Sequence, residues 1–157
     1  MVISVSEVNK VSIVYRKEPN RYLIGKRYEL ELARKLYKYG FAVIRAPASG
    51  RKAKRVPYPD IVAIKHRNIL VVSVKYRAKL GTIYVSQDEL KKMADFARRS
   101  DGIMVVAIKV RELGDWRVIP LATTNILYSN IDKLAITVDM IRNAKRLEDW
   151  LRENRLL

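Results

Sequence analysis

Three side chains in the segment 56–79 have types and a spacing that could do chemistry on a phosphate. Asp60 follows Pro59 at the start of one expected strand, and Ser73 and Lys75 lie near the end of the next. Side chains alternate across a strand, so Ser73 and Lys75 share a face, and a hairpin would bring Asp60 near them. A carboxylate offers Mg²⁺ a hard oxygen ligand, and a lysine can orient an attacking water. The alternative is that Asp60 only completes a turn after proline.

The charge of the chain indicates a polyanionic partner. Its 157 residues carry 32 Lys and Arg against 16 Asp and Glu, a net charge of +16. Neutralisation of phosphates with release of counterions explains why nucleic-acid-binding proteins have such a composition. A thermophilic surface is the alternative, but thermophilic proteins usually enrich both signs together in ion-pair networks. We therefore expect nucleic acid as the partner rather than a membrane surface or an acidic protein.

The scarcity of soft ligands limits the chemistry that is possible. The chain has no cysteine and one histidine, His66, which excludes a disulfide framework and a thiolate zinc site and disfavours a histidine-built metal site. Catalysis would have to use carboxylates, lysines or hydroxyls. The apolar runs are too short for a bilayer and no secretion signal begins the chain, so we expect a cytoplasmic protein.

The elements that must position these side chains can be predicted from hydrophobic periodicity and turn residues. We expect one α/β domain over 1–157, with a mixed central β-sheet flanked by helices. Residues 1–20 are predicted as an N-terminal strand or arm. The predicted helices are 21–40, 86–102 and 139–155, and the predicted strands are 41–46, 60–65, 68–77, 81–85, 103–110 and 115–121.

Several segments together resemble the archaeal Holliday junction resolvases of the PD-(D/E)xK nuclease superfamily. They are "GKRYELELARKLYKYGFAVIRAPASG", "PDIVAIK", "IYV" and "FARRSDG", in order and with compact spacing, and the resemblance extends over about residues 21 to 145. It implies a restriction-endonuclease-like fold and a homodimeric, Mg²⁺-dependent endonuclease, with Mn²⁺ as a possible substitute. The substrate implied is a four-way DNA junction, nicked symmetrically on two strands.

The resemblance also implies roles for individual residues. Glu29 falls on the helical catalytic glutamate, Asp60 on the metal-binding aspartate and Lys75 on the motif lysine. For Glu29 the alternative is a solvated helix face shared with Glu31, from which only the family register distinguishes it. Basic, hydroxyl and aromatic positions of the family are matched by Arg45, Ser49, Phe96 and Lys109.

Ser73 departs from the family pattern, which requires glutamate there. Three explanations remain open: a catalytically silent paralogue that only binds junctions, an engineered inactive variant, or a carboxylate that has moved elsewhere in the chain. Glu89 lies fourteen positions after Lys75. That spacing resembles a subgroup of restriction endonucleases in which serine replaces the strand glutamate and a glutamate of the following helix supplies the metal ligand.

Glu89 also has a purely structural explanation. Ser86-x-x-Glu89 is a capping box, and glutamate is favoured near a helix N-terminus. Both interpretations of Glu89 stay open at this stage.

Contacts with DNA and with a second copy are expected in two places. The loop after Pro47 carries a basic cluster that should bind backbone phosphates, made of Arg51, Lys52, Lys54 and Arg55. Two symmetric nicks call for a two-fold dimer, and Phe96 and the strand 103–108 are candidates for its contact.

Overall fold

A computed structural model describes residues 20–46, 57–127, 130 and 132–157. The expected arm 1–20 lies outside this range except for Asn20, and so does most of the basic loop. The helices are α2 (Arg21–Lys38), α3 (Gln87–Ser100), α4 (Thr123–Leu127), α5 (Val138–Asn143) and α6 (Leu147–Glu153). The strands are β1 (Ala42–Arg45), β2 (Ile61–Lys65), β3 (Asn68–Arg77), β4 (Ile83–Ser86), β5 (Ile103–Val110), β6 (Trp116–Leu121), β7 (Lys133–Ile136) and β8 (Lys145–Arg146).

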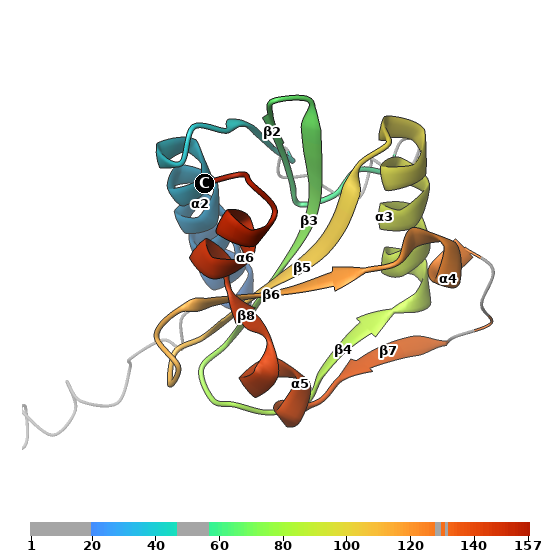
Figure 1. The fold of residues 1–157 in the computed structure, drawn as a ribbon. Coiled ribbons are helices and arrows are strands. Elements are labelled where there is room, and N and C mark those ends of the chain that lie inside the picture. The colour runs from blue at the N-terminus through green and yellow to red at the C-terminus, as the bar shows by residue number, and fades with distance from the viewer. Residues whose placement is uncertain (1–19, 47–56, 128–129, 131) are drawn as a thin grey trace, which may run out of the picture.

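Six strands form a twisted mixed sheet in the order β1-β2-β3-β5-β6-β8 (Figure 1). The pairing of β3 with β5 is parallel, because α3 crosses over between them, and the other pairings are antiparallel. This confirms the predicted α/β class and the mixed central sheet.

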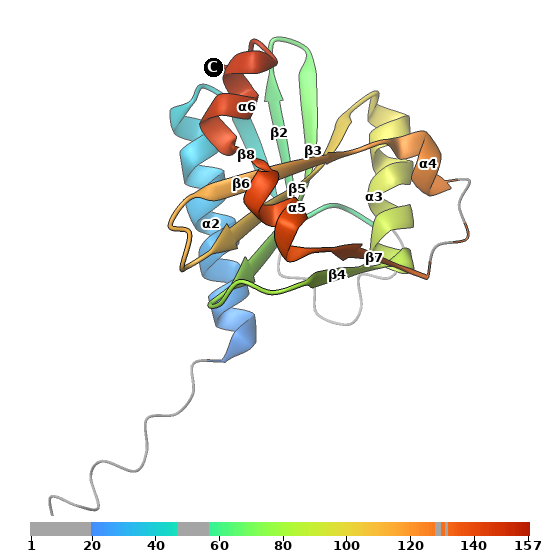
Figure 2. The same ribbon diagram turned by 60° about the horizontal axis from the view of Figure 1, so that its bottom comes forward.

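Helices lie on both faces of the sheet (Figures 1 and 2). A hydrophobic cluster fills the space on each face. One packs Leu32 and Leu36 of α2 and Trp150 of α6 against the sheet. The other packs Leu90 and Met93 of α3 against the opposite face. Helices with one apolar stripe each therefore hold the central strands β3 and β5 between two layers.

The β2–β3 hairpin forms as predicted. His66 and Arg67 connect the strands with φ values of 48° and 66°, as a two-residue type I′ turn requires. Ile61 pairs with Val72 in the hairpin register, so the residue before β2 reaches the level of Ser73. The hairpin thus brings Asp60 to the expected place.

The prediction of one C-terminal helix over 139–155 is wrong. The segment forms α5, the short strand β8 and α6. Arg117 donates to the carbonyl groups of Arg142 and Ala144, and β8 pairs with β6. Ile141 packs in the α3 cluster whereas Trp150 packs in the α2 cluster, so the segment crosses the sheet edge and a continuous helix could not fill both sites.

Two features were not predicted. β4 pairs with β7 as a separate antiparallel ribbon, and the single-turn α4 packs near α3. Over the described residues, no helix has the length and apolar character needed to cross a bilayer.

Candidate active site

Asp60 is fixed at the point where the chain enters β2. Its carboxylate Oδ2 accepts a hydrogen bond from the backbone N–H of Val74 at 2.7 Å, and its carbonyl accepts one from Ala46 at 2.9 Å. The side chain is therefore held against the backbone of β3, between Ser73 and Lys75.

Glu89 reaches the same place from α3. Ser86 caps the helix, its hydroxyl accepting from the Glu89 N–H at 3.2 Å. The Glu89 carboxylate accepts from the Ser73 hydroxyl at 2.7 Å and from the Lys75 ammonium at 2.8 Å to each oxygen. The backbone of Glu89 thus serves the cap while its side chain meets the strand residues, so both interpretations of the sequence describe part of what it does.

Ser73 leaves room for this contact. It is the buried polar residue of the described core, with a relative exposure of 1%. A small hydroxyl there admits the longer Glu89 side chain from the neighbouring helix. The Glu89 carboxylate from α3 therefore lies next to Ser73, the strand position where the family pattern has a glutamate.

Burial and mutual repulsion act on the carboxylates. Loss of hydration raises the pKa of Asp60, and the negative charge of Glu89 adds to the rise, while the Val74 N–H and the Lys75 ammonium oppose it. The pKa of Glu29 is also raised, first by burial and then by the charge of Asp60. Carboxylates that are close and only partly neutralised favour binding of a cation.

Glu29 approaches this group from α2. The charge of Asp60 contributes to its raised pKa, and the Arg45 guanidinium lies 3.9 Å from its Oε2. Arg45 is exposed at the end of β1, beside the carboxylates.

Lys109 is not brought to the site. It pairs in register with Tyr76, on the sheet face opposite Lys75. Its ammonium donates to the Gly114 carbonyl at 3.0 Å and lies 3.3 Å from Glu31. The other predicted DNA-binding residues lie outside the described part of the chain: Ser49, Arg51, Lys52, Lys54 and Arg55.

Further residues line the hollow over the carboxylates. It measures about 150 Å³ and includes Tyr58, Asp88 and Lys92 beside Asp60 and Glu89. Asp88 and Lys92 form an ion pair of 2.6 Å. Sequence reasoning missed these residues, although the position of Lys92 one turn after Glu89 on α3 could have indicated it.

The donor set suits a hard divalent cation. Among the residues that the structure describes, no group of three or more His, Cys, Asp or Glu side chains is gathered closely enough to hold a metal ion. Mg²⁺, however, keeps several waters and commonly takes only one or two protein carboxylates. Asp60 and Glu89 fit that requirement, and neither is a ligand type that would select a softer metal.

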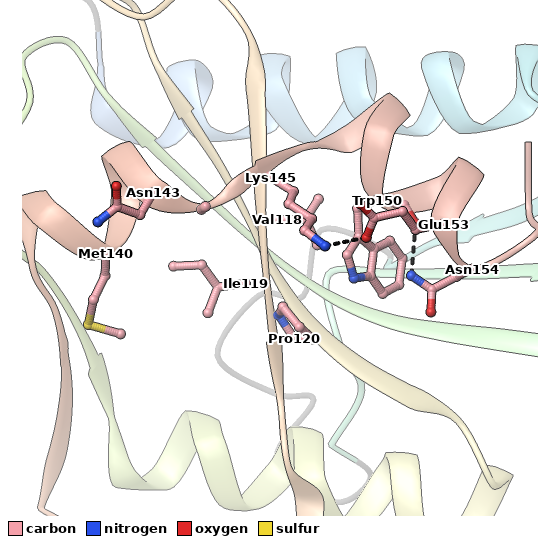
Figure 3. Close-up of a pocket in the computed structure, with 10 residues that line it drawn as sticks. Val118, Ile119, Pro120, Met140, Asn143, Lys145, Trp150, Glu153 and Asn154 are labelled. Carbon is pink, nitrogen blue, oxygen red and sulfur yellow. Dashed lines mark hydrogen bonds and ion pairs between the residues drawn. The ribbon is translucent and has the colours of Figure 1, made fainter.

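A second hollow, of about 480 Å³, lies between β6 and the C-terminal helices (Figure 3). Apolar groups of Val118, Ile119 and Trp150 line much of it, and Lys145 is ion-paired with Glu153 at its edge. It lacks the combination of carboxylates, hydroxyl and lysine found at Asp60.

Comparisons with known proteins show the family and the fold. The chain matches the family described as archaeal Holliday junction resolvase (hjc) over residues 20–155. The chain belongs to this family. A solved resolvase structure, Archaeoglobus fulgidus Hjc, superposes with a TM-score of 0.67 at 31% identity, covering 80% of this chain and 98% of that one. Its restriction-endonuclease-like fold is the fold predicted from the sequence.

Relatives of known sequence carry the name crossover junction endodeoxyribonuclease Hjc. The protein from Archaeoglobus fulgidus is 39% identical over 97 residues, which cover 62% of this chain and 68% of the relative. The protein from Sulfurisphaera tokodaii is 37% identical over 89 residues, 57% of this chain. That match spans only 61% of the relative's length.

Proposed function

We propose that this resolvase-family chain is an endodeoxyribonuclease that binds four-way DNA junctions and nicks them by metal-assisted phosphodiester hydrolysis. The observation that carries the proposal is the meeting of Asp60, Ser73, Lys75 and Glu89 at one point of the fold. Its relatives are named for cleavage of crossover junctions. The alternative is a junction-binding protein without catalysis.

Asp60 and Glu89 are the side chains that would hold the cation, Mg²⁺ by preference or Mn²⁺, with Glu29 beside them. Bound there, the cation would supply positive charge to offset that of the phosphate in the transition state. An ammonium group has three donors, so Lys75 can hold Glu89 and still donate to the attacking water or a phosphate oxygen. Its role is to position that water and to neutralise charge.

Ser73 positions Glu89 in this proposal. The hydroxyl donates to Oε1 and Lys75 donates to both oxygens, so the carboxylate is fixed where it lines the hollow. We infer that Glu89 replaces the strand glutamate of the family pattern. The chemistry of the chain has therefore moved from β3 to α3 rather than been lost.

Backbone phosphates would be bound by Arg45 and by the basic segment that follows it in the sequence. Arg45 lies beside Glu29, and the loop that follows it carries Ser49, Arg51, Lys52, Lys54 and Arg55. Binding by phosphate contacts carries little sequence information and weakens steeply with salt. We expect salt-sensitive binding to branched DNA with little sequence preference.

A homodimer would supply two sites for the two strands of a junction. The predicted contact strand 103–108 is unavailable, because β5 lies in the middle of the sheet and Met104 to Ile108 are buried. The β1–β2 apolar face, made of Ala42, Ile44, Val62 and Ile64, is accessible instead. Ile44 and Ile64 are 64% and 37% exposed, where α3 covers β3 and β5 but not β1.

A second copy of the chain fits this face because a two-fold axis would pair the same apolar patch with itself next to Asp60. Ile44→Asp should shift sedimentation from dimer to monomer at micromolar concentration. Tyr37→Asp, on an exposed side chain of α2, is the matched control and should leave the dimer intact. A dimer that survives Ile44→Asp would overturn this placement.

A labelled four-way junction tests the proposed activity. In Mg²⁺ the wild-type protein should nick two opposed strands, and in Ca²⁺ or EDTA it should bind without nicking. Asp60→Asn should bind equally well and not nick. Tight binding by wild type without nicking in either Mg²⁺ or Mn²⁺ would favour the silent junction binder, and equal affinity for linear duplex would remove the structural specificity.

A further inference from the structure

A groove adjoins the candidate active site at Lys75. It measures about 660 Å³ and runs between the first turns of α2 and the end of β3. Its lining residues are Arg21, Ile24, Gly25, Val74, Lys75, Tyr76, Arg77 and Ala78. Lys75 lines this groove and its ammonium donates to Glu89, so the groove and the candidate site share this residue.

The groove is positively charged. Among the residues that the structure describes, its lining includes Arg21, Lys75 and Arg77 and no acidic side chain. Within the described residues the Arg21 side chain has no hydrogen bond or ion pair. Arg77 uses one N–H for the carbonyl of its neighbour Tyr76 at 2.7 Å, and a guanidinium has five donors. Both arginines can therefore bind an anion without giving up a salt bridge.

The walls of the groove are held in place. Tyr76, which lines it, stacks on Tyr28 of α2 with ring centroids 3.8 Å apart and planes 10° apart. This pair ties α2 to β3 immediately beside Glu29 and Lys75. A Cβ at Gly25 would meet nothing within 4 Å, so the groove has free space at this residue.

We infer that this groove binds the DNA backbone next to the nick, with Arg21 and Arg77 contacting phosphates that flank the scissile one. The inference rests on the proposed function and adds where the cut strand leaves the site. Lys75 and Arg77 are two residues apart on β3, about 7 Å. Phosphates of one strand recur about every 3.4 Å along a duplex axis, so Arg77 reaches one or two nucleotides beyond the phosphate at Lys75.

Single neutral phosphates test this directly. A methylphosphonate is placed in turn at each of three positions on either side of the mapped nick, and junction affinity is measured in Ca²⁺. For wild type, one or two adjacent positions on one side should weaken binding roughly tenfold, the loss expected for a charged hydrogen bond. Arg21→Gln/Arg77→Gln should bind the unmodified junction at least tenfold more weakly and be insensitive at those same positions.

A matched variant controls for charge. Arg98→Gln/Arg99→Gln removes the same charge at the end of α3. That end packs against the start of β3, since a Cβ at Gly102 would meet Val71, whereas Arg77 ends the strand. This variant should keep the wild-type pattern of sensitive positions. In the proposed dimer the groove variant removes four charges, so it should also lower the slope of log affinity against log salt by about 4 relative to wild type.

The outcomes separate this inference from the proposed function. If wild type binds and nicks the junction while the groove variant keeps the wild-type sensitivity at every position, the groove assignment is overturned and the nuclease remains. If wild type does not bind the junction, the proposed function itself has failed. Both arginines are exposed, and an unchanged melting temperature confirms that the variant is folded.

Discussion

Two carboxylate clusters in this molecule have opposite electrostatics. At the Asp60 cluster, burial and neighbouring negative charge raise the pKa of Asp60 and of Glu29. At the Glu148 cluster, where α6 meets α2, burial works in the same direction but donors overcome it. Hydrogen bonds from Lys35 and Tyr39 hold the pKa of Glu148 at about 2.

The difference lies in how well neighbouring cations balance the carboxylates. Glu148 accepts from the Lys35 ammonium at 2.6 Å and from the Tyr39 hydroxyl at 2.7 Å, so its charge is satisfied and it fastens two helices together. At the other cluster three carboxylates, Asp60, Glu29 and Glu89, share chiefly two cations, Lys75 and the more distant Arg45. Unbalanced charge there costs stability and is suited to binding a cation and a phosphate.

Removing the Glu89 charge should have the largest effect. Glu89→Gln keeps the side-chain length and the N–H that Ser86 caps, but it removes a proposed metal ligand. We expect nicking in Mg²⁺ to fall by at least about 10²-fold to 10³-fold, with junction affinity in Ca²⁺ changed less than about threefold. Single-turnover cleavage and a binding titration measure the two effects.

Asp95→Asn is the control for this change. It removes a carboxylate from the same helix, where Asp95 pairs only with Arg98 and Arg99. It should nick like wild type. If Glu89→Gln also nicks like wild type, Glu89 is only a helix cap and the site depends on another ligand.

Moving the carboxylate back to β3 sharpens the comparison. Ser73→Glu places a carboxylate where the family pattern has it, and beside Glu89 it would crowd a second negative charge. In the Glu89→Gln background that crowding is relieved, so Ser73→Glu/Glu89→Gln should recover at least about tenfold in nicking over Glu89→Gln alone. A wild-type chain that never nicks, beside a Ser73→Glu variant that does, would show that the chemistry was lost rather than moved.

The hairpin and its neighbours could be predicted because local rules determine them. Alternation and a two-residue turn set the β2–β3 register, and the register brings Asp60 to Ser73. Ser86 marked the start of α3 through its capping chemistry. Contacts between distant segments do not follow from local rules. The sequence alone could therefore not decide whether Glu89 caps the helix or is a metal ligand.

The errors arose where tertiary contacts override periodicity. The segment 139–155 has a helical pattern throughout, yet Arg117 binds carbonyl groups at its middle and the chain crosses the sheet edge. Strand 103–108 was predicted as a candidate dimer contact because a fully buried strand and an interface strand have the same apolar pattern. Lys109 lies on the opposite face of the sheet from Lys75. The face depends on the β3–β5 register, which the sequence does not give.

Removing the satisfied carboxylate should destabilise the fold. Glu148→Gln loses the ion pair with Lys35, and we expect about 1–2 kcal/mol at pH 7, a figure reduced because the Lys35 side chain is 35% exposed. The pKa of Glu148 falls from 4.5 to about 2 on folding, so this stability is present above pH 4.5 and is lost as the pH falls toward 2. Urea unfolding of both proteins should converge over that interval. Glu153→Gln, on a more exposed pair, should change stability by less than about 0.5 kcal/mol.

Removing the charge of Asp60 should stabilise the fold, and this is the smallest effect expected. The pKa of Asp60 is raised above its ordinary 3.8, so the folded protein binds the proton more tightly than the unfolded chain does. The ionised group therefore costs stability at neutral pH, and the cost disappears as the pH falls below 3.8. Asp60→Asn retains an oxygen to accept from Val74, so it should stabilise the protein by about 1 kcal/mol at pH 7 without metal. Millimolar Mg²⁺ should raise the melting temperature of wild type but not of Asp60→Asn, because only the native carboxylate gains a cation. A variant that melts below wild type in EDTA would mean that Asp60 is a structural residue like Glu148.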